Sequence, residues 1–377
     1  MRVLILGAGF GGLELASTLA AETDGAVEVT LVDRTEGFVF GFSKLDVMFG
    51  RATADHVLHP YADLVHPGVR FVPATVTAID PQARTVETTA GRFEADVLVV
   101  ALGADLDPSA TPGLVEHGHE FYTEAGAFGL RDVLADFPGG DVVVAVTSTP
   151  FKCPPAPSET ALLVHDHLRD RGLLDRSSVS LVMPLPVPIP PSPTASKALL
   201  AQFERRGIAW HPGALVRSVE PGRAVLADGS ELPFDLLLAV PVHRAPSVVV
   251  ESGLTEDGWI QVDSETLQTR FEDVYAIGDV TSVGTPKAGV FAEGQAAVVA
   301  ARLIARSRGE DDATTYDGNG TCYLEFGGGL VGKVDVTFLR GLAPTGALVG
   351  PNIELAADKA VFGIERVRRW FGREWTP

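Results

Sequence analysis

Cysteine, positive charge and long apolar runs are all scarce in this chain of 377 residues. Two cysteines, Cys153 and Cys322, are too few for a disulfide framework or for a zinc or iron–sulfur site with four thiolate ligands. The 30 lysines and arginines face 49 aspartates and glutamates, and the net charge of −19 argues against nucleic acid as a partner. The sequence contains no uninterrupted apolar run of about 18 residues, so it predicts no membrane span. No targeting segment is visible at the N-terminus, so we expect a cytoplasmic protein.

Short runs of β-branched and aliphatic residues alternate with amphipathic stretches along most of the chain. Buried parallel strands and their crossover helices produce this alternation, so the predicted fold class is α/β with two doubly wound, Rossmann-like domains. We expect residues 1–112 and 244–312 to form the first domain and residues 113–243 the second. Aromatic alternation after Tyr316 predicts an antiparallel hairpin in a small C-terminal domain, residues 313–377.

A glycine-rich turn follows the first predicted strand. It reads Gly7-Ala8-Gly9-Phe10-Gly11-Gly12, which fits G-x-G-x-x-G between a strand and a helix pattern. Gly7 permits the tight turn, Gly9 lets a pyrophosphate approach the backbone, and Gly12 allows close packing of helix on strand. Asp33 ends the next strand, where a carboxylate accepts hydrogen bonds from a ribose, and Arg34 follows it. This order predicts a dinucleotide site but does not separate FAD from NAD.

Two further strand ends carry small-residue turns. One contains Ala101 and Gly103, and the other contains Gly278 and Asp279. Here the chain resembles the flavoprotein oxidoreductases with two dinucleotide-binding domains, which carry corresponding turns. The resemblance implies that the cofactor is FAD, that Asp279 contacts its ribityl chain and that the main chain near Val76 lies by its adenine.

Several branches of these flavoproteins do not fit the residues. The chain has neither the CxxxxC pair of glutathione reductase-like enzymes nor the CxxC of thioredoxin reductases. The first turn of the second domain, residues 147–155, has no glycine and contains three prolines, which remove backbone donors that a phosphate needs. The second domain is therefore not expected to bind NAD(P)H.

Four segments instead resemble flavocytochrome c sulfide dehydrogenases and sulfide:quinone oxidoreductases. They are FKCPPAPSETALLVHDHL, SKALLAQFERRGIAWHPG, GDVTSVGTPKAGVFAEGQAAVVAARLI and GTCYLEF. The resemblance implies that Cys153 and Cys322 face the flavin as a redox pair that handles sulfur, with Glu159 as a proton acceptor and Lys287 near the reduced ring. It also implies sulfide or a related sulfur compound as donor, and a quinone or a separate protein as acceptor. Lys44 lies in the FAD-proximal segment, where relatives commonly have apolar residues or proline.

Each of these residues also has a simpler interpretation. Cys153 lies in a proline-rich loop beside Lys152 and before a predicted helix, which would lower the pKa of its thiol, but two distant cysteines can also be unrelated buried thiols. Glu159 could be a first-turn acid that interacts with the helix dipole, and Lys287 a surface lysine. If the two cysteines form a redox pair, hydrosulfide attacks a Cys153–Cys322 disulfide to give a persulfide and a thiolate.

The C-terminal residues 359–377 are locally basic and aromatic, with Phe362, Val367, Trp370, Phe371 and Trp375 among five lysines and arginines. Such a segment predicts either a peripheral membrane contact or a helix docked on the protein by its aromatic face.

The histidines show no metal-ligand spacing, and no CxxCH haem site is present, so no metal is expected. Two alternative functions stay open: a type II NAD(P)H:quinone dehydrogenase and a non-catalytic flavin-binding sensor. We expect a monomer or a homodimer.

Overall fold

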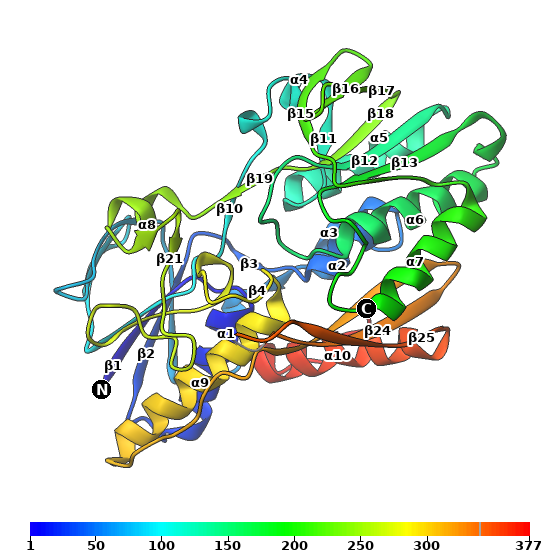
Figure 1. Ribbon diagram of the computed structural model, residues 1–377. Helices are drawn as coiled ribbons and strands as arrows, with labels where there is room; N and C mark the ends of the chain where they lie inside the picture. The colour runs from blue at the N-terminus through cyan, green and yellow to red at the C-terminus, as the bar shows by residue number, and fades with distance from the viewer. Residues whose placement is uncertain (339–340) are drawn as a thin grey trace.

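The computed structural model describes residues 1–338 and 341–377 and contains two five-stranded parallel sheets (Figure 1). The first sheet has the strand order β22-β9-β1-β2-β5. Its strands are β1 (Arg2–Leu6), β2 (Glu28–Asp33), β5 (Val69–Pro73), β9 (Val97–Val100) and β22 (Val274–Ala276). Every residue of β9 is buried, as expected of a strand covered on both faces.

Helices cover one face of the first sheet and a small sheet covers the other. The helical side holds α1 (Phe10–Glu22), α9 (Gly289–Arg308) and α10 (Glu354–Phe371), which share one core with β1. The opposite side holds the antiparallel sheet of β6 (Val76–Asp80), β7 (Thr85–Thr88) and β8 (Gly91–Glu94), together with α8 (Ser247–Glu251). The shorter elements of this half are β3 (Gly37–Phe38), α2 (Gly41–Met48), α3 (Ala54–Val57), β4 (His59–Pro60), η1 (Tyr61–Asp63), β20 (Thr255–Glu256), β21 (Trp259–Ile260) and η4 (Gly278–Val280).

The second sheet has the strand order β11-β18-β12-β13-β14. Its strands are β11 (His119–Glu120), β12 (Asp141–Val146), β13 (Ser178–Met183), β14 (Ala209–Pro212) and β18 (Leu236–Val240). One face packs on α5 (Glu124–Asp136), α6 (Ala156–Asp170) and α7 (Pro193–Arg206). The other face packs on α4 (Leu114–His117) and the antiparallel strands β15 (Val216–Glu220), β16 (Arg223–Leu226) and β17 (Glu231–Pro233). The predicted α/β class with two Rossmann-like sheets is confirmed.

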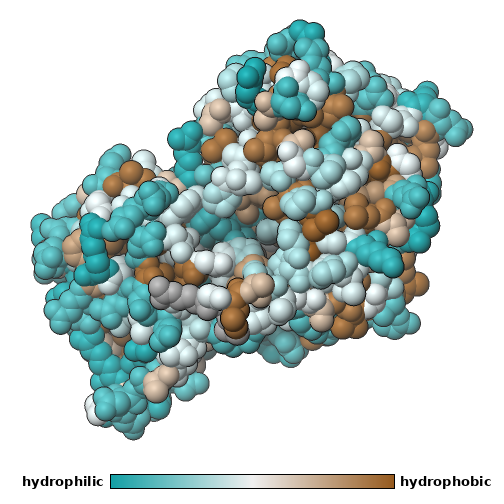
Figure 2. Space-filling view, in the orientation of Figure 1, coloured by the Kyte–Doolittle hydropathy of each residue, from teal (hydrophilic) through white to brown (hydrophobic). Residues whose placement is uncertain are grey.

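A two-stranded ribbon joins the two halves. It pairs β10 (Asp105–Asp107) with β19 (Val242–Arg244) in antiparallel fashion, where the chain leaves the first half and later returns. The ribbon lies near the predicted boundaries at residues 112 and 244, which remain predictions. Figure 2 shows the resulting two-lobed outline, with hydrophobic side chains gathered mainly over the lobe that holds the second sheet.

The C-terminal segment forms an antiparallel sheet followed by α10. Strands β23 (Asn319–Gly327) and β24 (Leu330–Thr337) make the expected hairpin, and β25 (Thr345–Asn352) adds a third strand. Figure 1 shows α10 running along the base of the molecule beneath β24 and β25. Among the described residues, no helix is both long enough and apolar enough to cross a membrane.

The aromatic face of α10 docks on the first half of the protein. Trp370 is fully buried and its ring meets those of Phe10, Phe38 and Phe40, while its indole N–H donates to Glu14 at 2.9 Å. Val367, Phe371 and Trp375 are also buried, whereas Phe362 is half-buried. Of the two interpretations of this segment, these contacts favour a helix docked on the protein. A membrane contact through its remaining residues stays a prediction.

Replacing Trp370 by alanine is expected to lower the free energy of unfolding by about 3–5 kcal/mol, because it empties a buried indole site and removes one of the two partners of Glu14, the other being Arg369. Urea unfolding followed by far-UV circular dichroism measures the loss. Val361→Ala on the exposed side of the same helix is the matched control and should change stability little. A small effect of the tryptophan substitution would mean that α10 does not depend on this contact.

Candidate functional site

Four strand ends of the first sheet line up along one edge. Leu6, Val32, Val100 and Ala276 occupy one row, because β1 pairs in register with β2 and β9, and β9 with β22. The glycine-rich turn, Asp33, the turn at Ala101 and the turn at Gly278 follow directly on these ends. With a strand spacing of about 4.8 Å, the row from β22 to β2 spans roughly 14 Å. The edge therefore brings the predicted dinucleotide-binding turns together in one line.

The glycine-rich turn is packed as its predicted roles require. A Cβ on Gly12 would lie 1.9 Å from the carbonyl oxygen of Gly7, and a Cβ on Gly7 would lie 2.3 Å from that of Ala101. Gly9 differs, since a Cβ there meets no atom of residues 1–338 or 341–377 within 4 Å. Gly9 is also the N-cap of α1, and no side chain caps this helix start. The turn thus leaves both space and free backbone N–H groups at the helix N-terminus, which suits a pyrophosphate.

The acidic residue at the end of β2 braces the turn. Asp33 accepts hydrogen bonds from the backbone N–H of Ala8 at 2.7 Å and from that of Thr35 at 2.8 Å. Arg34 forms an exposed ion pair with Asp105 at 3.2 Å. Val76 is the first residue of β6 and packs against the core on the face of the sheet opposite α1. Contacts of these residues with a ribose or an adenine stay predictions.

The turn after β22 is held by α9. The N–H of Gly278 donates to Gln295 of that helix at 2.6 Å. Burial raises the pKa of Asp279, and in the described part of the chain no group donates a hydrogen bond to its carboxylate. The start of α9 also lacks a side-chain cap, with Ala288 as N-cap. A buried carboxylate that still has free acceptor capacity suits the polyol contact expected of Asp279.

Lys287 lies just before α9 and is almost fully buried. Its ammonium donates to the carbonyl oxygens of Asp279 and Thr281, the latter at 3.2 Å, and lies 3.3 Å from the ring centre of Trp259. Burial lowers its pKa to about 8. The alternative of a surface lysine is therefore wrong, since this side chain is inside the protein. A role near a reduced flavin stays a prediction.

Cys153 sits against the start of α9, beside the nucleotide edge. Its backbone N–H donates to the carbonyl of Lys287 at 2.7 Å, and its side chain is exposed to solvent. Its φ of +52° is a left-handed conformation that non-glycine residues rarely adopt. Such strain is common at functional sites, where the surroundings hold the backbone in place. The loop between β12 and α6 thus presents this thiol at the junction of the two halves.

The expected depression of the Cys153 pKa is wrong. Burial among protein atoms, the carboxylate of Glu159 and the nearby Cys322 together raise the pKa of this thiol well above its ordinary value. The side chain is accessible to solvent, yet protein surrounds it closely enough for desolvation to dominate over Lys152 and the helix start. Burial likewise raises the pKa of Cys322 to about 12. At neutral pH both residues are therefore thiols rather than thiolates.

Glu159 lies near both cysteines, since its charge raises the pKa of each thiol. It is buried in the first turn of α6, and it accepts a hydrogen bond from the backbone N–H of Glu325 at 2.8 Å. Cys322 lies three residues before Glu325 on β23, so this bond ties the two cysteine-bearing segments together. Burial raises the pKa of Glu159 to about 7. The structure thus gathers Cys153, Cys322 and Glu159 into one group, although the cysteines are 169 positions apart (322 − 153).

Lys44 reaches the same group from α2. Its ammonium donates to the carbonyl of Tyr122 at 2.6 Å, and the Tyr122 hydroxyl lies 3.5 Å from the carbonyl oxygen of Cys153. Burial and the charge of Lys152 lower the pKa of Lys44 to about 8. Sequence reasoning missed Tyr122, because nothing in its local pattern distinguishes it from a core aromatic residue.

The residues along the edge fit a flavin dinucleotide. The open space at Gly9, the uncapped starts of α1 and α9, and the carboxylate of Asp279 all lie along one row of strand ends. By contrast, the loop after β12 has no comparable cradle, because it carries no glycine. Nowhere in residues 1–338 and 341–377 do three or more histidine, cysteine or acidic side chains gather in a way that could hold a metal ion.

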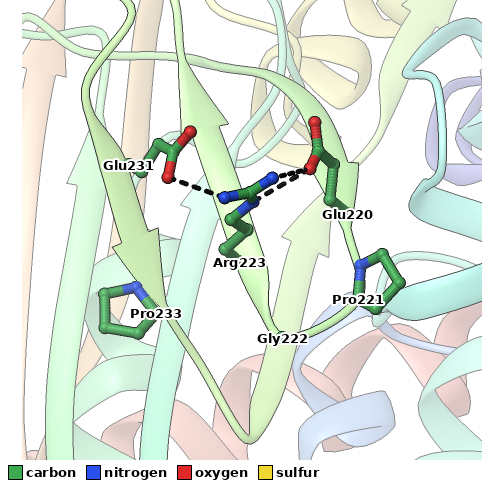
Figure 3. A pocket seen from close by; sticks show the side chains of 6 residues that line it. All are labelled: Glu220, Pro221, Gly222, Arg223, Glu231 and Pro233. Carbon is green, nitrogen blue, oxygen red and sulfur yellow. Dashed lines mark hydrogen bonds and ion pairs between the residues drawn. The ribbon is translucent and has the colours of Figure 1, made fainter.

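A surface hollow of about 530 Å³ lies far from this chemistry, between β15, β16 and β17. Figure 3 shows Arg223 at its centre, held between Glu220 and Glu231. The guanidinium already has two acidic partners, so it is not available to pair with an anionic ligand. We assign no site there.

Comparison with known proteins gives a consistent picture. A family model described as pyridine nucleotide-disulphide oxidoreductase matches residues 1–302. The chain is 24% identical over 336 residues to a mitochondrial sulfide:quinone oxidoreductase of Dictyostelium discoideum, covering 85% of this chain and 74% of that protein. It is 29% identical over 300 residues to an NADH dehydrogenase-like protein of Mycobacterium tuberculosis, covering 74% and 73%. The crystal structure of the sulfide:quinone oxidoreductase from Aquifex aeolicus superimposes with a TM-score of 0.86 at 20% identity, covering 99% of this chain and 92% of that one.

Proposed function

Because this chain belongs to the pyridine nucleotide-disulphide oxidoreductase family, and is therefore a flavin-dependent oxidoreductase, we propose that it binds FAD and oxidises sulfide or a related sulfur compound through Cys153 and Cys322. One observation carries the proposal. Two cysteines far apart in the chain both lie close enough to the buried carboxyl group of Glu159 for its charge to raise their pKa values, and Cys153 adjoins the edge where the dinucleotide-binding turns line up. Two unrelated thiols would not be expected to lie near the same buried carboxyl group.

Each of these residues has its own role in the proposed reaction. In the oxidised state the two cysteines form a disulfide, and hydrosulfide attacks one sulfur to give a persulfide on that cysteine and a thiolate on the other. Glu159, whose pKa is about 7, takes up the proton that the attacking sulfur loses. FAD supplies the two-electron acceptor, so that HS⁻ and one further proton yield zero-valent sulfur and the reduced cofactor. The nearby Lys44 and Lys152 favour an anionic substrate.

The electron acceptor is proposed to be a quinone, as in the names of the sulfide:quinone relatives. The half-buried rings of Phe42, Tyr323 and Phe362 lie together between α2, β23 and α10. They place aromatic rings next to the cysteine-bearing strand, and Lys359, Lys333 and Arg366 lie near the ring faces. Aromatic rings with basic groups beside them suit a planar acceptor that carries carbonyl oxygens.

A second candidate is oxidation of NADH, because some relatives are named as NADH dehydrogenase-like proteins or type II NADH:quinone oxidoreductases. The loop after β12 does not favour it, since it has no glycine at the turn. A non-catalytic flavin-binding protein is the third possibility.

Anaerobic reduction of the FAD-loaded protein separates these functions. Sulfide is expected to bleach the flavin absorbance near ~450 nm within seconds, NADH is expected to act far more slowly, and a soluble quinone should restore the colour. Bleaching by NADH alone would favour the dehydrogenase. Bleaching by neither donor, in a protein that dithionite still reduces, would favour the non-catalytic reading.

A further inference from the structure

A partly buried charged cluster adjoins Glu159 and has no part in the chemistry above. Glu325 is its centre, accepting hydrogen bonds from Arg51 at 2.6 and 3.2 Å, and it also accepts one from Lys359 of α10. Arg51 also pairs with Asp46 of α2 at 2.9 Å. The backbone N–H of Glu325 is the group that holds Glu159. The cluster therefore connects the C-terminal helix to the carboxyl group between the cysteines.

The charges in this cluster balance only when one carboxyl group is neutral. Three carboxyl groups, those of Asp46, Glu159 and Glu325, face two cations, Arg51 and Lys359. Glu325 contacts both cations, which hold its pKa at about 2 despite its burial, and Asp46 contacts Arg51. Within the described residues, Glu159 has no cation at ion-pair distance. It is consequently the carboxyl group that gains and loses a proton near neutral pH.

Lys359 is the cation that matters most for Glu159. Its side chain is 13% exposed and that of Arg51 is 38% exposed, so solvent screens the arginine more. Burial and the carboxylate of Glu325 on β23 disfavour the ionised form of Glu159. Cys153 in the loop and Cys322 on β23 also lie near it, but they are uncharged thiols near neutral pH. Lys359 opposes the effect of Glu325, as Arg51 does more weakly, and the place of Lys359 is set by its ion pair with Glu325.

We propose that Lys359, held by Glu325, is a positioning residue that sets the proton affinity of Glu159 and thereby the pH range in which the cysteine pair works. The catalytic part of this statement rests on the proposed function, whereas the electrostatic part does not. Through the ion pair between Lys359 and Glu325, the C-terminal helix α10 influences the proposed redox centre.

Infrared titration of the FAD-loaded protein tests the electrostatic part directly. The band of protonated Glu159, identified by its loss in Glu159→Gln, should titrate near pH 7 in the unchanged protein. Lys359→Gln is expected to move this midpoint upward by about one unit, because the ionised carboxylate loses its main opposing charge. Lys359→Arg should restore the midpoint, and Lys359→Met serves as a second neutral variant if glutamine does not support folding.

Lys333→Gln is the matched control. Lys333 pairs with Asp358 of the same helix at 3.1 Å but is not part of the cluster, so its loss should leave the Glu159 midpoint unchanged. Equal midpoints in Lys359→Gln, Lys333→Gln and the unchanged protein would overturn the proposal.

The pH dependence of sulfide-driven flavin reduction separates the two claims. With Glu159 as base, the rate rises with pH through its midpoint, and Lys359→Gln should move this rise upward by the same amount as the infrared midpoint. If sulfide reduces no variant while the infrared shift occurs, the proposed function fails and the electrostatic role of Lys359 stands. If sulfide reduces the flavin but neither midpoint moves, the inference about Lys359 fails alone.

Discussion

Replacing Cys153 by serine is expected to lower the rate of sulfide-driven flavin reduction by a factor of at least about 10³. A serine hydroxyl can form neither a disulfide nor a persulfide, so the proposed entry of sulfur into the protein is lost. FAD content should not change, because the contact of this residue with Lys287 is made by its backbone N–H. Stopped-flow absorbance after anaerobic mixing with sulfide measures the rate.

Cys322→Ser is the companion variant and should show a loss of similar size, because each cysteine needs the other to form the disulfide. Dithionite should still reduce the flavin in both variants, which controls for an intact cofactor. If either variant kept the sulfide-dependent rate, the cysteines would be unrelated thiols and the proposed pair would be wrong.

Alanine at Gly9 is expected to release FAD without unfolding the protein. A Cβ at this position meets no protein atom within 4 Å, and φ of −76° is accessible to alanine, so the apoprotein should keep its stability. The added methyl group would occupy the space through which a pyrophosphate approaches the start of α1. We expect FAD affinity to fall by at least about tenfold, an amount that corresponds to about 1.4 kcal/mol.

Gly12→Ala is expected to act differently, since its Cβ would lie 1.9 Å from the carbonyl oxygen of Gly7 and the helix must shift away from the strand. This variant should lose both FAD and stability. Gly129→Ala in α5, where a Cβ also meets none of the described atoms within 4 Å, is the control; it should leave FAD content unchanged and raise stability by about 0.5–1 kcal/mol, because alanine suits a helix interior better than glycine. FAD retained after gel filtration and urea unfolding of the apoproteins give the two readouts. Full FAD retention in Gly9→Ala would contradict the placement of the pyrophosphate.

Much of the fold was predictable because its signals are local. Buried strands such as β9 and β12 appear as uninterrupted aliphatic runs, and G-x-G-x-x-G marks a strand, a tight turn and a helix within a few residues. The pairing of Cys153 with Cys322 came from resemblance, since nothing near either residue points to the other. Their meeting at Glu159 depends on how β23 packs against α6.

The pKa of Cys153 was predicted wrongly from its neighbours in the sequence, and the charged cluster around Glu325 was missed. Lys152 and a helix start suggested a low pKa for Cys153, but desolvation by the surrounding protein outweighs both. Glu325 stood in the sequence as one charged residue between Leu324 and Phe326, which are both fully buried. That interruption of an apolar strand was the local signal of the partly buried cluster. Its partners, Arg51 and Lys359, are 274 and 34 positions away and could not be inferred from spacing.

The sequence by itself determined the α/β class, the dinucleotide-binding turn and the identity of the two sulfur atoms available for redox chemistry, because each depends on residue type and short-range order. Only the tertiary structure decided the proton affinities of Cys153, Glu159 and Lys287, and the role of the C-terminal helix. A pKa reflects every charge and every apolar atom around a group, and these come from segments that meet only when the chain has folded. The aromatic tail likewise became a buried face of α10 because the rings of Phe10, Phe38 and Phe40 lie opposite it.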